Sequence, residues 1–148
     1  MKLKNQAIKT NLIDKVSIRI RFSEVDSMRV VWHGEYIRYF EDGRESFGRQ
    51  YGLNYMDVYA MGYTIPLVYI KCEFKYPLRV GDTAIIETRY LDCEAAKIKF
   101  EYCIYRESDM VLVAEGESVQ VFLNNENELE LTMPKFYKEW KKKWGLNK

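Results

Sequence analysis

The residues best suited to do chemistry lie between positions 22 and 36, where one short segment holds a carboxylate, the single histidine of the chain and a glycine. Asp26 precedes a predicted helix that begins near His33 or Gly34. The first N–H groups of a helix have no partners within it and carry the positive end of its dipole. A loop carboxylate facing them would combine a nucleophile or general base with an oxyanion donor. The apolar run at residues 30–32 would keep water scarce, which suits acyl transfer from an activated ester.

Two hydrophobic periods flank this segment and predict the elements that position it. Apolar and polar residues alternate over residues 16–22, which predicts a strand with one buried face. The period then becomes helical, and we expect a helix over residues 35–51. Its apolar stripe consists of Tyr36, Ile37, Phe40, Gly43, Phe47 and Tyr51. A glycine on that stripe indicates that something packs closely against Gly43, and Gly52 is expected to end the helix.

The rest of the chain predicts a sheet that covers this helix. A short helical turn near residues 55–60 is followed by predicted strands at 65–76, 83–91, 95–106 and 111–123, and by a terminal helix at 134–144. Short turns make the later strands an antiparallel meander. The order of these elements, one strand, one long helix and then four strands, predicts an α+β fold in which a curved five-stranded antiparallel sheet wraps around one central helix. We expect a single domain over residues 1–148, with an N-terminal extension at 1–14 and a basic C-terminal helix at 134–148.

Composition excludes several classes of protein. The 148 residues carry 23 Lys and Arg against 22 Asp and Glu, so a nucleic-acid binder held by a broad basic field is disfavoured. No apolar run approaches the roughly 20 residues that span a bilayer, and the N-terminus lacks a secretory hydrophobic core. We therefore expect a cytoplasmic protein without a transmembrane segment. With one histidine and three cysteines outside any CxxC pair, we expect no metal site and no disulfide framework.

One string of residues resembles a known family. Asp26-x-x-x-Val30-Val31-Trp32-His33-x-x-Tyr36, followed by Tyr39-Phe40-Glu41-x-x-Arg44, resembles the 4-hydroxybenzoyl-CoA thioesterase group of hotdog acyl-CoA thioesterases. Weaker agreement at residues 76–82 and 114–116 extends the resemblance over about residues 16–123. It implies a hotdog fold and hydrolysis of a fatty or aromatic acyl thioester of coenzyme A or acyl carrier protein. Coenzyme A would be part of the substrate, and no separate cofactor is implied.

The resemblance also implies roles for individual residues. Asp26 would be the catalytic carboxylate, as nucleophile or as base toward water, and the backbone N–H of His33 would polarise the thioester carbonyl. Some similar hotdog enzymes use a helix carboxylate, which makes Glu41 the reserve catalyst. The residues expected to bind substrate are Trp32, Gly34, Tyr36 and Arg79. Two positions depart from the family pattern, since Arg29 stands where glycine is usual and Glu35 where asparagine is usual.

Other interpretations of these residues remain open at this stage. Asp26 could cap a turn or the helix, as loop aspartates often do. Glu41 and Arg44 are expected to form an ion pair, because they are three residues apart on the helix. The basic tail could bind an anionic membrane or the phosphates of coenzyme A, although an amphipathic helix packed on the sheet is the favoured interpretation.

Three functions and one mode of assembly follow. The leading function is a thioesterase that works as a homodimer or homotetramer with its pocket at a subunit boundary. A non-catalytic acyl-thioester-binding module is the second. An enoyl-thioester hydratase is the third, and it is disfavoured because Asp26 and His33 are seven residues apart, whereas that branch has Asp-x-x-x-x-His.

Overall fold

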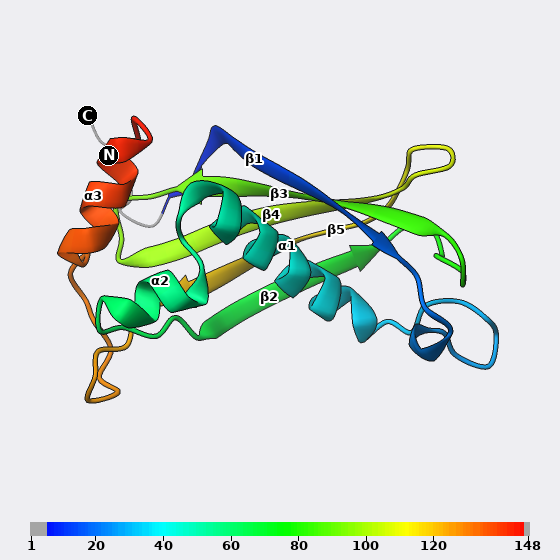
Figure 1. The fold of residues 1–148 in the computed structure, drawn as a ribbon, viewed down its shortest axis with the longest axis horizontal. Helices are drawn as coiled ribbons and strands as arrows, with labels where there is room; N and C mark the ends of the chain where they lie inside the picture. The colour runs from blue at the N-terminus through cyan, green and yellow to red at the C-terminus, as the bar shows by residue number, and fades with distance from the viewer. Residues whose placement is uncertain (1–5, 147–148) are drawn as a thin grey trace.

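The computed structural model describes residues 6–146 of the chain. In chain order its elements are β1 (Ile8–Arg19), the short 3₁₀ helix η1 (Phe22–Glu24), α1 (Glu35–Tyr51), α2 (Tyr55–Ala60), β2 (Leu67–Phe74), β3 (Thr83–Asp92), β4 (Lys97–Arg106), β5 (Val111–Val121) and α3 (Lys135–Lys143). Figure 1 shows α1 crossing the sheet, with α2 and α3 gathered near the end where α1 finishes. None of the described helices is long and apolar enough to cross a lipid bilayer.

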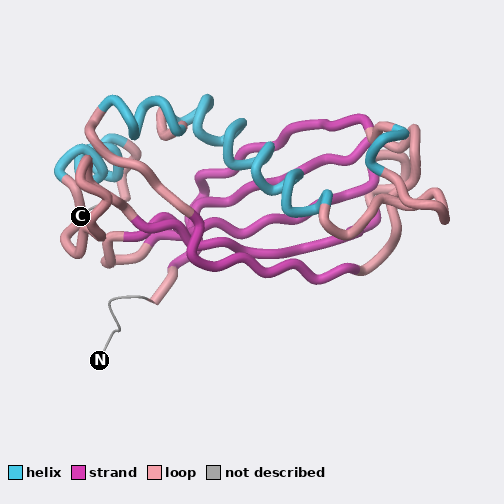
Figure 2. The backbone as a smooth tube through the Cα atoms, turned by 90° about the horizontal axis from the view of Figure 1, so that it is seen from below, coloured by secondary structure: helices cyan, strands magenta, loops and turns pink. Residues whose placement is uncertain are grey.

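All five strands form one antiparallel sheet in the order β1-β3-β4-β5-β2. The sheet curls around α1, which lies across its inner face (Figure 2). This arrangement confirms the predicted sheet around a central helix and is the hotdog fold. The predicted meander holds only for β3, β4 and β5. Residues 75–82 form a connection longer than a hairpin turn, and β2 lies at the far edge, where it pairs with β5 and not with β3.

The first strand differs most from its prediction. β1 begins at Ile8, so residues 8–14 belong to the sheet and not to the extension expected at residues 1–14. A register shift interrupts the pairing of β1 with β3 near its start, which hides the strand from a search for strict alternation. The remaining part of the expected extension, residues 1–5, lies outside the described residues.

The end of β1 also lies elsewhere than expected. The strand stops at Arg19, and Phe22 is 74% exposed in η1 instead of lying on the buried face of the strand. The other helices and strands are confirmed, with ends that differ from the predicted ones by at most two residues. The basic C-terminal helix expected at 134–148 is shorter, because α3 ends at Lys143. Residues 147–148 of that segment lie outside the described part.

Gly43 allows α1 to pack closely against β3 of the sheet. A Cβ at Gly43 would lie 2.4 Å from Oγ1 of Thr88 and 2.8 Å from Cγ2 of Ile86, both on β3. This confirms the close approach predicted for Gly43. The apolar stripe is confirmed except for Ile37, which is 37% exposed, while Tyr39 is fully buried. At its end α1 stops at Gly52, whose φ of 75° is in the left-handed region that favours glycine.

Beneath α1 a buried guanidinium belongs to the core. Arg44 is 6% exposed, and its Nη1 donates a hydrogen bond of 3.0 Å to the hydroxyl of Tyr102. That hydroxyl in turn bonds Oγ of Ser118 at 2.5 Å. The predicted ion pair between Glu41 and Arg44 is wrong, because Arg44 turns into the core while Glu41 stays on the exposed side of the helix.

The terminal helix packs against the end of α1. The indole N–H groups of Trp140 and Trp144 both donate to the backbone carbonyl of Tyr51, at 2.7 and 3.0 Å. Trp140 is 6% exposed, whereas the neighbouring Lys142 and Lys143 are exposed. The structure therefore agrees with the favoured interpretation of the tail as an amphipathic helix that packs on the domain.

Candidate active site

The loop that carries the candidate carboxylate is fastened to a neighbouring turn. The N–H of Val31 donates to the carbonyl of Leu78 at 2.8 Å, and Val30 forms a β-bridge with Arg79. Farther along, the N–H of Ile20 donates to the carbonyl of Asp82 at 2.9 Å. The loop between β1 and α1 and the turn between β2 and β3 therefore form one supported unit at the end of the molecule where α1 begins (Figure 1).

Asp26 shapes a tight turn inside this loop. Its Oδ1 accepts the N–H of Met28 at 2.8 Å and that of Val30 at 3.4 Å. The Asp26 carbonyl accepts the N–H of Arg29 at 2.9 Å, and Arg29 has a φ of 66°. Arg29 thus adopts the left-handed conformation that favours glycine, so the loop keeps the tight turn although the glycine of the family pattern is absent. Asp26 is exposed, and among the described residues its Oδ2 has no hydrogen-bond partner.

The start of α1 offers two free backbone donors. The N–H of Glu35 donates to the carbonyl of Trp32 at 2.9 Å, and that of Tyr36 donates to the carbonyl of His33 at 3.3 Å. The N–H groups of His33 and Gly34 have no hydrogen-bond partner in the part of the chain that the structure describes. These two amides, at the positive end of the helix dipole, are available to a developing oxyanion.

The indole of Trp32 lies over this helix start. A Cβ at Gly34 would lie 1.9 Å from Cζ3 of Trp32, so the ring occupies the space that only glycine leaves open. The Trp32 and His33 rings are 4.7 Å apart, and Trp32 is 51% exposed. The ring is therefore an exposed apolar wall beside the free amides, consistent with a contact to substrate.

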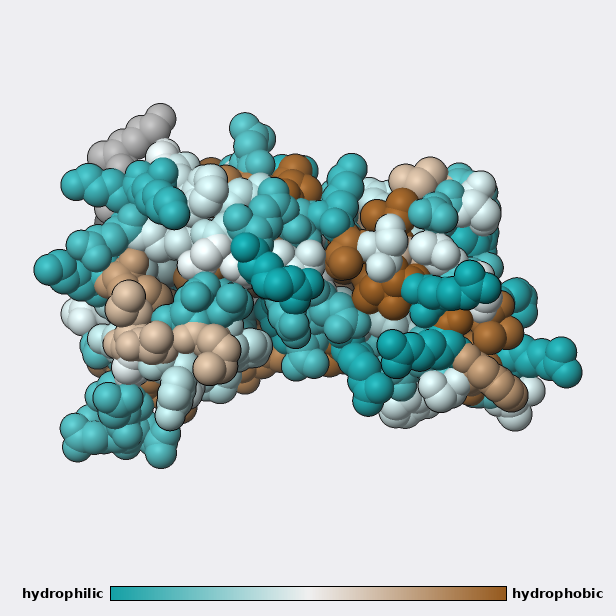
Figure 3. Space-filling model, in the orientation of Figure 1, coloured by the Kyte–Doolittle hydropathy of each residue, from teal (hydrophilic) through white to brown (hydrophobic). Residues whose placement is uncertain are grey.

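Two hollows open beside the loop. One of about 580 Å³ is lined by Phe22, Val25, Asp26, Ser27, Arg29 and Val80. A second of about 680 Å³ runs between β1 and the outer side of α1, and Phe22 and Val80 line both. Figure 3 shows hydrophobic side chains at this end of the molecule with long hydrophilic side chains between them. The carboxylate of Asp26 thus borders a space large enough for part of a substrate.

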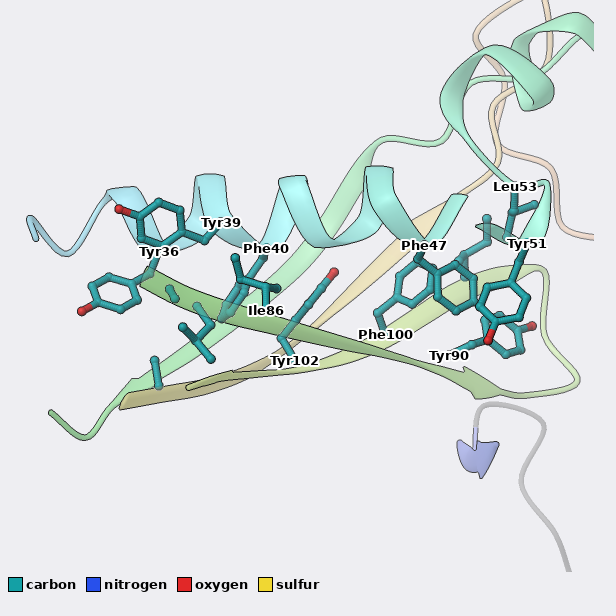
Figure 4. Close-up of a cluster of buried hydrophobic side chains, with 14 of the residues drawn as sticks. Tyr36, Tyr39, Phe40, Phe47, Tyr51, Leu53, Ile86, Tyr90, Phe100 and Tyr102 are labelled. Atoms are coloured by element: carbon teal, nitrogen blue, oxygen red, sulfur yellow. The ribbon is translucent and has the colours of Figure 1, made fainter. Parts of the chain in front are cut away.

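Tyr36 turns inward from the first turn of α1. It is 3% exposed, and its ring lies 5.8 Å from that of Tyr39 (Figure 4). The Tyr36 ring also lies 5.1 Å from that of Phe74 on β2. Burial raises the pKa of the Tyr36 phenol, and a hydrogen bond with the Leu78 backbone opposes part of that rise. Tyr36 therefore connects the helix start to the edge strand β2, and its neutral hydroxyl lies near the supported loop.

The structure brings most of the predicted residues together but not all. Asp26, Trp32, His33 and Gly34 lie in the same loop and helix start, and Arg79 pairs with that loop. Glu41 lies two helical turns farther along on the exposed side of α1 and borders neither hollow. Glu35, which has no predicted role, has a side chain 14% exposed with Oε1 3.5 Å from Nη1 of Arg38.

Sequence reasoning missed Glu24, which supports the loop from inside. Its Oε1 accepts the N–H of Arg21 at 2.8 Å, and its backbone carbonyl accepts the N–H of Trp32 at 3.0 Å. Glu24 thereby ties the end of β1 to the start of α1 across the turn of Asp26. The three-residue spacing from Arg21 is that of a capping box, which is the signal that could have indicated this role.

Fold and site together define a hotdog domain in which the loop that carries Asp26 leads into the free amides at the start of the central helix. The chain belongs to the thioesterase-like superfamily, whose family model matches residues 20–141. It is 27% identical over 128 residues to YneP of Bacillus subtilis, whose name assigns it provisionally to the acyl-CoA thioesterases; the match covers 86% of this chain and 92% of YneP. It is 28% identical over 111 residues to the chloroplastic acyl-acyl carrier protein thioesterase ATL3 of Arabidopsis thaliana, covering 75% of this chain and 58% of ATL3.

A solved structure shows the same fold. The hypothetical protein TT1821 of Thermus thermophilus is 29% identical and superposes with a TM-score of 0.77, covering 85% of this chain and 95% of TT1821. The membership and the fold together define the class of enzyme as a thioester hydrolase.

Proposed function

We propose that this protein hydrolyses acyl thioesters of coenzyme A or acyl carrier protein to the free acid and the thiol. The observation that carries the proposal is the exposed carboxylate of Asp26 in a supported loop that leads into the two free amides of the α1 start. The names of the relatives, which include an acyl-CoA and an acyl carrier protein thioesterase, support the substrate class. The proposal includes no metal and no cofactor beyond the substrate's own coenzyme A, and it places the enzyme in the cytoplasm.

Asp26 can act in this reaction in two ways. As a general base it would take a proton from a water molecule while the water oxygen attacks the thioester carbon. As a nucleophile it would form a mixed anhydride that water then hydrolyses. In both cases the carbonyl oxygen gains negative charge, which the N–H groups of His33 and Gly34 would stabilise. Collapse of the tetrahedral intermediate expels the thiolate, which then takes up a proton.

The substrate would lie across the helix start. Trp32 would supply an exposed apolar wall, Gly34 the close approach to the backbone, and Tyr36 the inner lining toward β2. Arg79, bridged to the Asp26 loop, would contact the phosphate-bearing arm of the substrate. Chain length and aromatic preference depend on the depth of this space in the assembled protein.

The pocket would be completed by a second subunit. Within the described sheet β2 pairs with β5 alone, and it carries the exposed Val68, Tyr69 and Phe74, at 59%, 47% and 54% exposure. Exposed charged residues lie on both edge strands, but the opposite edge, β1, has a single exposed large apolar side chain, Ile8 at 45%. Because Phe74 contacts Tyr36, a homodimer formed at β2 would place the acyl pocket at the subunit boundary, and two dimers could join into a tetramer.

A panel of acyl thioesters with a free-thiol readout tests the function. We expect the wild type to release thiol from at least one acyl-CoA or acyl carrier protein thioester, and Asp26→Ala to lose most of that activity. If the wild type binds acyl thioesters without releasing thiol, the protein is a binding module. If it consumes enoyl thioesters without releasing thiol, it is a hydratase, and the proposal fails in either case.

A further inference from the structure

The end of the molecule that holds Asp26 is rich in arginine. Five of the nine arginines lie within residues 19–38 and 76–82, whereas none of the fourteen lysines does. Arginine, aromatic residues and methionine are enriched at protein interfaces and lysine is depleted there. The composition of this end is therefore that of an interface and differs from the lysine-rich remainder of the surface.

Backbone contacts bring four of these arginines onto one surface, which we call the arginine rim. Its members are Arg19, Arg21, Arg29 and Arg79, and all four are exposed. The carbonyl of Ile20, between the first two, accepts the N–H of Gly81 at 3.2 Å, and the residue after Arg29 bridges to Arg79. Among the described residues, no carboxylate lies within ion-pair distance of any of the four guanidinium groups.

The nearby carboxylates are held by the backbone. Glu24 accepts the N–H of Arg21, and Asp82 accepts the N–H of Arg79 at 2.9 Å, and both acids are half-buried. These two carboxylates thus accept hydrogen bonds from main-chain N–H groups, while the guanidinium groups of the rim are exposed to solvent. Residues 19–38 and 76–82 hold five arginines against four acidic residues, so the positive character of the rim comes from its four exposed, unpaired guanidinium groups and not from a local excess of charge.

Exposed apolar side chains lie among the arginines. Phe22 is 74%, Met28 76% and Val80 45% exposed, and Phe22 and Val80 form the ridge between the two hollows. A nucleotide would need guanidiniums converging on one phosphate cluster. A spread of unpaired arginines with aromatic and aliphatic residues between them fits a broader acidic protein surface.

We propose that the arginine rim, with Phe22 and Val80, docks an acidic acyl carrier protein that delivers its thioester to Asp26. The inference rests on the proposed thioesterase function and selects the carrier protein from its two substrate classes. Arg29, Phe22 and Val80 line the hollow that Asp26 borders, so a carrier docked on the rim would hold its acyl arm next to the loop carboxylate.

The test compares one acyl group on two carriers. Arg19→Glu/Arg21→Glu changes rim residues that do not line the Asp26 hollow. We expect its KM for the acyl carrier protein thioester to rise about tenfold or more with kcat retained at saturation, and its KM for the acyl-CoA to change less than about twofold. Arg19→Lys/Arg21→Lys should restore most of the carrier-protein KM. Lys142→Glu, an exposed charge reversal on α3, should leave the KM for both thioesters unchanged.

A binding measurement separates this inference from the proposed function. Titration calorimetry with a carrier protein bearing a non-hydrolysable thioether should show binding by the wild type that weakens with salt and is lost in the Glu double variant. Equal losses toward both carriers, or a wild type that hydrolyses acyl-CoA and does not bind the thioether carrier, would overturn the docking proposal alone. A wild type that binds the thioether carrier at the rim but releases thiol from no substrate would overturn the proposed function and leave the docking surface standing.

Discussion

At the scale of single residues, the geometry of Asp26 is compatible with both roles that the sequence suggests, the cap of a turn and the catalytic carboxylate. One carboxylate oxygen closes the turn by accepting main-chain N–H groups, and the other has no partner among the described residues. The turn fixes the carboxylate within the loop, so in the proposed mechanism one oxygen holds the geometry and the other is left to act on the substrate.

Gly34 tests whether Trp32 belongs to the substrate site. In Gly34→Ala the new methyl group would overlap the Trp32 ring, and the half-exposed ring should swing into solvent. We expect KM to rise severalfold, with the free energy of unfolding changed by no more than about 1 kcal/mol. Steady-state kinetics and urea denaturation check this. An unchanged KM would show that Trp32 does not contact substrate.

Asp42, on the outer side of α1, makes the stability of the fold depend on pH. Burial raises its pKa, and the charges of Glu41, Glu45 and Glu24 add to that rise while Arg38 opposes it. Because the native carboxyl holds its proton more tightly than the unfolded chain, stability falls as pH rises from the unfolded value of 3.8 through the folded pKa. We expect Asp42→Asn to be more stable than wild type at neutral pH and to lose that advantage in acid.

Asp109 supplies a control of opposite sign. A hydrogen bond from Arg106 lowers the pKa of Asp109, so this ionised carboxylate stabilises the native state at neutral pH and loses its contribution as the pH falls below 3.8. Asp109→Asn should therefore be less stable than wild type at neutral pH, and the difference should vanish in acid. Urea denaturation of both variants across this pH range is the measurement, and shifts of the same sign would contradict the argument.

At the scale of elements, the contact of α1 with β3 depends on Gly43. Alanine there should gain up to about 1 kcal/mol of helix propensity but force its methyl group against Thr88 and Ile86, which overpacking typically penalises by about 1–3 kcal/mol. We expect Gly43→Ala to be destabilised in urea denaturation. Gln50→Ala, an exposed change in the same helix, should be neutral or stabilising. A stabilised Gly43→Ala would show that α1 has room to shift.

The elements themselves were largely predictable, because their signals are local. α1 shows a helical period over its whole length and ends at a glycine, and both bounds of Glu35–Tyr51 were predicted. The position of β2 was not predictable, since the alternation of Val68 with Phe74 resembles that of a buried strand although both are more than half exposed. In the proposed dimer these exposed apolar residues would contact a second subunit, and a local pattern cannot distinguish such a surface from a core.

The candidate site was likewise predictable where its residues are close in sequence and not where they come from distant strands. Asp26, His33 and Gly34 lie within one continuous segment, so their proximity follows from the chain itself. The burial of Arg44 was not predictable, because its partners Tyr102 and Ser118 come from strands far along the chain. Spacing on a helix permits an ion pair, but the sheet decides which way a side chain turns.

At the scale of the whole molecule, assembly is the main expectation. We expect light scattering to give at least twice the chain mass of 17.7 kDa at micromolar concentration. Val68→Lys should shift the protein toward monomer, because a charge on the β2 edge opposes pairing. Asn11→Lys, on the exposed side of the β1 edge, should leave the assembly intact. A monomeric wild type, or dissociation by Asn11→Lys alone, would contradict a shared pocket at β2.

The central claim is that Asp26 carries out thioester hydrolysis, and the direct test is the kinetics of Asp26→Asn beside Glu41→Gln. Asparagine keeps the size of the side chain and its main-chain acceptor, so binding should persist. We expect kcat to fall by about 10²–10⁴-fold with little change in KM, residual activity from the free amides of α1, and near wild-type turnover for Glu41→Gln. Near wild-type turnover in Asp26→Asn together with loss of activity in Glu41→Gln would contradict the account and move catalysis to the helix.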